Sequence, residues 1–140
     1  MFGFRLGKVS VVRIFLVDDN AMIRSHLRAI LERQNDWVVV GEAENGRRFL
    51  EGWSELSPNV TLMDFVMPEM DGLEAARQIR REHPEAQILM VTIDPSLQLA
   101  QEAERVGIRG LVAKADLGSL FAAVEALLKG KKYFPIPATA

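Results

Sequence analysis

The sequence predicts a doubly wound α/β domain, in which a five-stranded parallel sheet carries helices on both faces. Two observations favour this class. Short apolar runs rich in β-branched residues alternate five times with segments whose apolar residues recur at helical spacing. The connections between them are short, as expected for parallel strands joined by right-handed helical crossovers. The length of 140 residues fits about one domain.

Five apolar runs are expected to form the strands. Most of them are too continuously apolar for a half-exposed strand, which favours strands buried on both faces. The third run leads directly into Asp64, and the first stops at two aspartates. In chain order, the expected strands are residues 9–17, 37–40, 58–63, 88–92 and 110–113.

The first three helices follow from apolar spacing and from residues that start or stop a helix. In residues 21–33, Ile23 and Leu27 begin an apolar stripe with the i, i+4 spacing of one helical face. Asn45 is expected to cap the second helix. The third helix must end before Pro84, because the residue preceding a proline avoids helical dihedrals.

The last two helices are predicted by similar signals. Pro95 or Ser96 is expected to open the fourth helix, and Gly107 lies where a left-handed C-terminal cap is favoured. Asp116 is expected to cap the fifth helix, which should end at Gly130.

Composition excludes several classes of protein. With 0 Cys and 2 His, the chain has no disulfide framework, no thiolate zinc site and no three-histidine zinc site. A net charge of -2 argues against a dedicated nucleic-acid binder. Every uncharged stretch is far shorter than the roughly 20 residues of a membrane span, and residues 1–8 do not resemble a signal peptide. We therefore expect a cytoplasmic domain that follows a short N-terminal extension, residues 1–8.

Polar residues end the predicted strands: Asp18 and Asp19 the first, Asp64 the third, Thr92 the fourth and Lys114 the fifth. Ligands of such sheets bind beyond the carboxyl ends of the strands. Carboxylates crowded there repel one another by about 4 kcal/mol per pair at 4 Å and an effective dielectric near 20, so a cation should offset the repulsion. Oxygen ligands without histidine or sulfur favour Mg²⁺.

Four motifs make the chain similar to the receiver domains of bacterial two-component response regulators, over about residues 12–132. Two further stretches, VGEAENG at 40–46 and GKKYF at 130–134, resemble receivers of the NarL/FixJ subfamily, which precede a LuxR-type helix-turn-helix output domain. We expect a receiver over residues 9–131, a tail or linker start over 132–140, and no output domain. The four motifs are VDDN at 17–20, LMDFVMPEMDG at 62–72, VT at 91–92 and GLVAK at 110–114.

The resemblance implies a flavodoxin-like sheet with strand order 2-1-3-4-5. It also implies that Asp64 is the phosphoacceptor and that Mg²⁺ is the cofactor. Asp19 would be a direct ligand of the ion together with Asp64, the main-chain carbonyl of Val66 would be another, and Asp18 would be a less direct partner.

The resemblance further implies a signalling switch and not a metabolic enzyme. Thr92 would donate its hydroxyl to the phosphoryl group, and the ammonium of Lys114 would neutralise charge. A negative phosphoryl group on Asp64 would then shift the helix that follows the fourth strand. The expected partners are a sensor histidine kinase and, after phosphorylation, a second copy of the chain. Neither direct nucleic-acid binding nor membrane binding is expected.

Two positions depart from the family pattern. Leu111 stands where the family usually has an aromatic residue that switches rotamer, and Ile93 stands where a small residue usually follows the threonine. Because Leu111 has no aromatic ring, the first departure argues against a switch that works by rotation of an aromatic side chain. The second predicts that Ile93 crowds the water that would hydrolyse the aspartyl phosphate, and hence predicts slow dephosphorylation.

Three other hypotheses compete with the switch. A receiver-like scaffold would work by protein contact alone, with a switch blunted by Leu111 and Ile93. A Mg²⁺-dependent phosphatase with an aspartyl nucleophile fits less well, because Val66 stands where that chemistry commonly has a second aspartate. A flavodoxin relative fits least, because no phosphate-binding loop follows the first strand.

Overall fold

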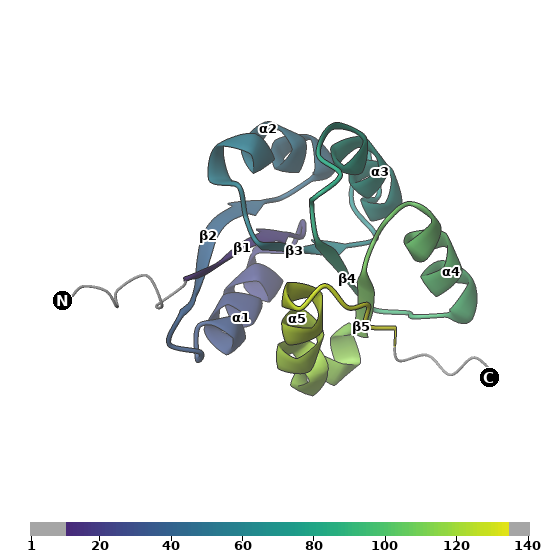
Figure 1. The fold of residues 1–140 in the computed structure, drawn as a ribbon. Helices are drawn as coiled ribbons and strands as arrows, with labels where there is room; N and C mark the ends of the chain where they lie inside the picture. Colours follow the sequence, from purple (N-terminus) through teal and green to yellow (C-terminus); the bar gives the residue numbers. More distant parts are fainter. Residues whose placement is uncertain (1–10, 135–140) are drawn as a thin grey trace.

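The sheet has five parallel strands in the order β2-β1-β3-β4-β5, as predicted. The structure is a computed structural model, and it describes residues 11–134. The reversal of strand order beside β1 makes the sheet doubly wound, with helices on both faces (Figure 1). The strands are β1 (Val12–Val17), β2 (Trp37–Ala43), β3 (Val60–Asp64), β4 (Ile88–Thr92) and β5 (Gly110–Ala113).

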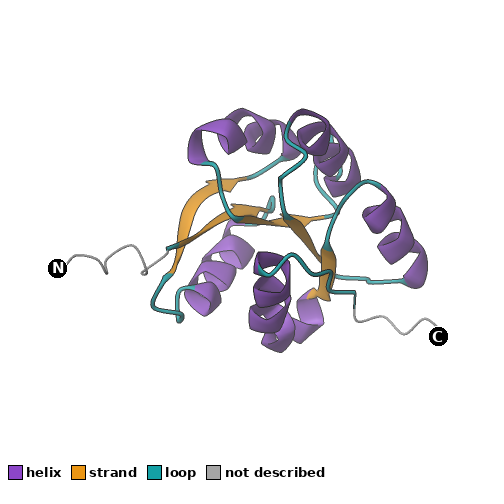
Figure 2. Ribbon diagram, viewed as in Figure 1, coloured by secondary structure: helices purple, strands orange, loops and turns teal. Residues whose placement is uncertain are grey.

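The helices divide between the two faces of the sheet. In Figures 1 and 2, α2, α3 and α4 cover one face, while α1 and α5 cover the other. A short 3₁₀ helix, η2 (Lys114–Ser119), precedes α5. The α-helices are α1 (Ala21–Leu31), α2 (Gly46–Leu56), α3 (Gly72–Glu82), α4 (Leu97–Arg105) and α5 (Leu120–Leu128).

Each face of the sheet has its own hydrophobic layer, because alternate strand residues point to opposite sides. Phe15 packs toward α2, where its ring meets Phe49 edge-on with centroids 5.6 Å apart. Its neighbours in β1, Ile14 and Leu16, pack in the other layer with residues of α1 and α5. All the residues of β3 and β4 are buried, which agrees with strands covered on both faces.

Most predicted boundaries lie close to the observed ones, and two differ more. The strand predicted over 37–40 continues to Ala43. The expected start of β1 at residue 9 and the extension 1–8 lie outside the described residues. Asp116 does not cap the last helix: it has non-helical dihedrals inside η2, and α5 begins only at Leu120. The Asp116 carbonyl instead accepts a 3.0 Å hydrogen bond from the Ser119 hydroxyl.

The segment after α5 returns to the edge of β5. Tyr133 forms an isolated parallel bridge with Gly110, and its carbonyl accepts a 2.9 Å hydrogen bond from the Leu111 N–H. Contacts with the sheet therefore continue past residue 131, where we expected the domain to end. Residues 135–140 of the expected tail lie outside the described part of the chain. Among residues 11–134, no helix has the length and apolarity to cross a membrane.

Candidate functional site

Three carboxylates meet at the carboxyl edge of the sheet. Asp18 and Asp19 follow β1, and Asp64 is the last residue of β3, the strand paired with β1. One carboxylate oxygen from each lies within 4.8 Å of those of the other two. Because parallel strands end on the same side, two strand ends are enough to gather these negative charges.

Lys114 places one positive charge among them. It follows β5, and its Nζ lies 2.9 Å from Oδ2 of Asp18 and 3.3 Å from Oδ2 of Asp64. The side chains of both aspartates are almost fully buried, and that of Lys114 is largely buried. The site thus combines three acidic groups with one ammonium.

The pKa values of this group reflect burial and the neighbouring charges. Burial raises the pKa of Asp64, and the negative charge of Asp18 raises it further, against the opposing effect of Lys114. Burial alone would lower the pKa of Lys114, but its hydrogen bonds and ion pairs with the two aspartates outweigh burial and raise it. Lys114 therefore stays charged, while Asp64 lacks full compensation for its negative charge.

The loop after Asp64 depends on a close backbone approach. The Gly72 N–H donates a 2.9 Å hydrogen bond to the Phe65 carbonyl and closes the loop. A Cβ atom on Gly72 would lie 2.5 Å from the Asp64 carbonyl oxygen, which is closer than real Cβ contacts. Glycine is therefore required where α3 begins behind the carboxylate. Within the loop, Glu69 adopts a φ of 70°, and the Val66 side chain is exposed.

The β4 side of the site is more open. Thr92 ends β4 and is buried, and its Oγ1 accepts a long 3.4 Å hydrogen bond from the Asp94 N–H. Ile93 is 74% exposed. A cleft of about 350 Å³ runs between the loop after Asp64 and α4, lined by residues that include Val66, Thr92 and Ile93. This exposure shows that the Ile93 side chain is not packed in the core against α4.

Leu111 lies on the sheet side of α4. It is buried in the same layer as Leu99, Ala100 and Ala103 of that helix. The position at which the resemblance implies an aromatic switch is therefore filled by an aliphatic side chain packed in the core.

The donor set fits a small divalent cation. It offers only oxygen ligands, and its three carboxylates lie close enough to share one ion. Hard cations such as Mg²⁺ prefer such ligands, and Mg²⁺ is commonly held by one or two carboxylates. A cation would also offset the burial and the repulsion by Asp18 that together raise the pKa of Asp64.

Two residues near the site were missed by sequence reasoning. Arg24 donates hydrogen bonds to the Asp18 carbonyl at 2.5 Å and to Glu42 at 2.8 Å. Glu42 also pairs with Arg28. A signal was present, because Arg24 and Arg28 share a helical face through their i, i+4 spacing. The sequence alone did not reveal the acidic partner, which lies on another strand.

His83, at the end of α3, makes contacts with α2. Its ring packs on Trp53 with centroids 4.5 Å apart, and its Nε2 lies 3.2 Å from the Ser54 hydroxyl. These contacts tie the end of α3 to α2, away from the carboxylate site. His26 is exposed on α1.

Comparison with known proteins gives consistent matches. The response regulator receiver domain family matches residues 14–125. The transcriptional regulatory protein YdfI of Bacillus subtilis is 34% identical over 119 residues, 84% of this chain and 55% of YdfI. The chemotaxis protein CheY of Thermotoga maritima is 35% identical over 120 residues, 86% of this chain and 98% of CheY. The chain thus spans about half the length of YdfI and nearly all of CheY.

Solved structures agree. A LuxR-family two-component response regulator from Aurantimonas sp. SI85-9A1 superimposes with a TM-score of 0.86 and 34% identity, covering 89% of each chain. This protein is similar to the chain in both fold and sequence. The match supports the resemblance to receivers that precede LuxR-type output domains. The strand order, the sequence family and these relatives lead to one conclusion: the chain belongs to the receiver domain family of two-component response regulators.

Proposed function

We propose that this receiver is a phosphorylation-dependent switch in which Asp64 accepts a phosphoryl group from a sensor histidine kinase, in a Mg²⁺-dependent reaction. The main support is the ammonium of Lys114, 3.3 Å from the Asp64 carboxylate and 2.9 Å from that of Asp18. A buried nucleophile beside a fixed cation suits phosphoryl transfer, which depends on positioning and charge stabilisation more than on covalent help.

In the proposed reaction, a carboxylate oxygen of Asp64 attacks phosphorus. The phosphorus–nitrogen bond of the donor phosphohistidine breaks, and the neutral imidazole is regenerated by taking a proton from solvent. Lys114 stabilises the negative phosphoryl oxygens. Asp18, Asp19, Asp64 and the Val66 carbonyl would hold Mg²⁺, which supplies further charge neutralisation when bound.

The response to phosphorylation is proposed to run through the β4 side. Thr92 would turn its hydroxyl toward the new phosphoryl oxygens, exchanging its long hydrogen bond from Asp94 for a stronger one to a charged acceptor. The adjoining cleft leaves room for α4 to follow. The buried Leu111 would then transmit the change by repacking instead of by aromatic rotation.

Labelling with acetyl phosphate or phosphoramidate tests the proposal. Intact-mass analysis should show one added phosphoryl group with Mg²⁺ and none with EDTA. Asp64→Asn should abolish labelling, while the control Asp94→Asn, which changes an exposed neighbouring carboxylate, should keep it. Comparable Mg²⁺-dependent labelling of Asp64→Asn would contradict the assignment of Asp64, and wild-type protein that takes up no phosphoryl group would favour the contact-only scaffold.

We also propose that phosphorylation promotes pairing of two copies through helical faces. In support, α5 exposes Phe121 and Leu128 beside the buried stripe that holds it to the sheet. Sedimentation velocity with Mg²⁺, with and without beryllofluoride, should show a larger sedimentation coefficient for the beryllofluoride form. Equal coefficients at high protein concentration would indicate a monomer.

A further inference from the structure

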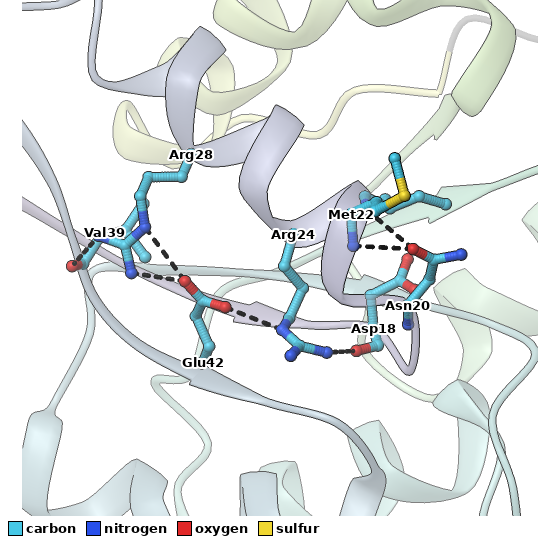
Figure 3. Close-up of polar contacts among 8 residues, drawn as sticks. Asp18, Asn20, Met22, Arg24, Arg28, Val39 and Glu42 are labelled. Carbon is cyan, nitrogen blue, oxygen red and sulfur yellow. Dashed lines mark hydrogen bonds and ion pairs between the residues drawn. The ribbon is translucent and has the colours of Figure 1, made fainter.

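Arg24 links the carboxylate site to the neighbouring strand. From the first turns of α1, its Nη1 donates to the main-chain carbonyl of Asp18 at 2.5 Å, and its Nε donates to Oε1 of Glu42 at 2.8 Å. Figure 3 shows the guanidinium lying between these two partners. The Arg24 side chain is only 17% exposed, so the contact is partly shielded from water.

The carbonyl that Arg24 binds belongs to the peptide unit between Asp18 and Asp19. A peptide unit is planar, so fixing the direction of its carbonyl also fixes the N–H and Cα atom of the next residue. Asp18 has other restraints: its N–H donates to the Ala43 carbonyl at 3.0 Å, and its carboxylate binds Lys114. Asp19 is exposed, so the plane of this peptide is a main determinant of where its carboxylate points.

We infer that Arg24, held by Glu42, is a positioning residue that orients the Asp18–Asp19 peptide and thereby aims the Asp19 carboxylate at the divalent cation. The inference rests on the proposed function, because it assumes that the three carboxylates hold Mg²⁺. It adds a second layer of residues, outside the carboxylates themselves, that sets the affinity for the ion. Such supporting residues commonly change metal affinity about 10- to 100-fold.

Arg28 provides a matched control. It lies one turn further along α1, and its Nη2 pairs with Oε2 of the same Glu42 at 2.5 Å. Its Nη1 turns to the Val39 carbonyl at 3.4 Å and not toward the site (Figure 3). Arg24→Gln and Arg28→Gln therefore each remove one guanidinium from Glu42, but only the first frees the Asp18 carbonyl.

The experiment measures Mg²⁺ affinity from the amide chemical shifts of Asp19 and its neighbours, and stability by thermal unfolding. Arg24→Gln should weaken Mg²⁺ binding about 10-fold, whereas Arg28→Gln should stay within about twofold of wild type, at similar melting temperatures. A general loosening of α1 would instead weaken binding equally in both variants and would overturn the inference.

Arg24→Lys keeps the charge but lacks the planar fork that reaches two acceptors. It should also weaken Mg²⁺ binding, and it decides the question if Arg24→Gln does not fold. Wild-type affinity in a folded Arg24 variant would overturn the positioning role alone. Wild-type protein that neither binds Mg²⁺ nor becomes labelled would overturn the proposed function as well.

Discussion

The two sides of the carboxylate site differ in how firmly they are held. On the β1 side, Asp18 is bound through its carboxylate by Lys114, through its carbonyl by Arg24 and through its N–H by β2. On the β4 side, Thr92 accepts one long hydrogen bond, and Ile93 is exposed beside a cleft. The firmly held charged groups thus lie on one side of Asp64, and the open cleft lies on the other.

This difference fits the two tasks of a switch. Groups that must bind a cation and a phosphoryl group work best when they are already oriented, because no reorganisation is then needed during the reaction. Groups that must respond to the added charge need a second arrangement to move into. We therefore expect substitutions on the β1 side to change stability and metal binding, and those on the β4 side to change the fate of the phosphoryl group.

The largest effect is expected from Lys114→Ala. This variant leaves Asp18 and Asp64 facing each other without the ammonium, and breaking a buried ion pair costs about 3 kcal/mol. Urea unfolding at neutral pH measures the loss. The control Lys129→Ala breaks an exposed pair with Glu125 and should cost less than about 0.5 kcal/mol. Equally small losses of stability in the two variants would show that the charge of Lys114 does not stabilise the arrangement of Asp18 and Asp64.

Gly72→Ala should come next. Its Cβ would meet the Asp64 carbonyl oxygen at 2.5 Å, and backbone atoms yield less easily than side-chain ends. Overpacking of this kind costs about 2 kcal/mol. At Gly118 the nearest atom to an added Cβ is 3.8 Å away, so Gly118→Ala should be nearly neutral by the same denaturation assay. If the two variants lose the same free energy of unfolding, the loop after Asp64 adjusts to an added Cβ more easily than the 2.5 Å contact indicates.

Ile93→Ala tests the open side. If the side chain crowds the path of water toward phosphorus, the variant should lose its phosphoryl group up to about tenfold faster, equivalent to about 1.4 kcal/mol in the barrier. Because Ile93 is largely exposed, stability should change by less than about 0.5 kcal/mol. Decay is followed by intact mass. Met22→Ala removes an exposed side chain on the β1 side and should decay at the wild-type rate; an unchanged Ile93→Ala rate contradicts crowding.

The smallest effect is a pH-dependent stabilisation by Asp64→Asn. Burial and Asp18 raise the pKa of Asp64 above the usual 3.8, so the ionised carboxyl opposes folding at neutral pH. Removing its charge should therefore stabilise the domain slightly in the absence of Mg²⁺. The gain should shrink as pH falls through the raised pKa toward 3.8, because Asp64 then becomes neutral in wild type too. A gain in melting temperature that grows on acidification would contradict this sign.

Local signals predicted the elements better than their exact starts. Asn45, Asp71 and Ser96 cap α2, α3 and α4 through side-chain hydrogen bonds, two of them at positions that the sequence had marked. Asp116 carried the same kind of signal but lies in the 3₁₀ turn η2. Capping propensity cannot distinguish a helix start from the turn before it, because a side chain such as that of aspartate can accept hydrogen bonds from backbone N–H groups in either place.

The sequence by itself determined the sheet and the meeting of the acidic residues. Apolar runs that end in Asp18, Asp64 and Lys114 bring these side chains to one edge in any parallel sheet, whatever its finer geometry. No detail of packing is needed for that conclusion, because parallel strands end on the same side.

Only the tertiary structure decided which residues support the site. The register between β1 and β2 shifts between Ile14 and Phe15, so that Leu16 pairs with Glu42. Val39 packs in the hydrophobic layer that also contains residues of α1. Because of the irregularity, Glu42, three residues later, lies on the same face of the sheet as Val39 and pairs with Arg24 of α1. A shift of one residue turns a side chain to the opposite face of the sheet. That contact joins residues 18 positions apart and depends on a bulge that periodicity does not reveal.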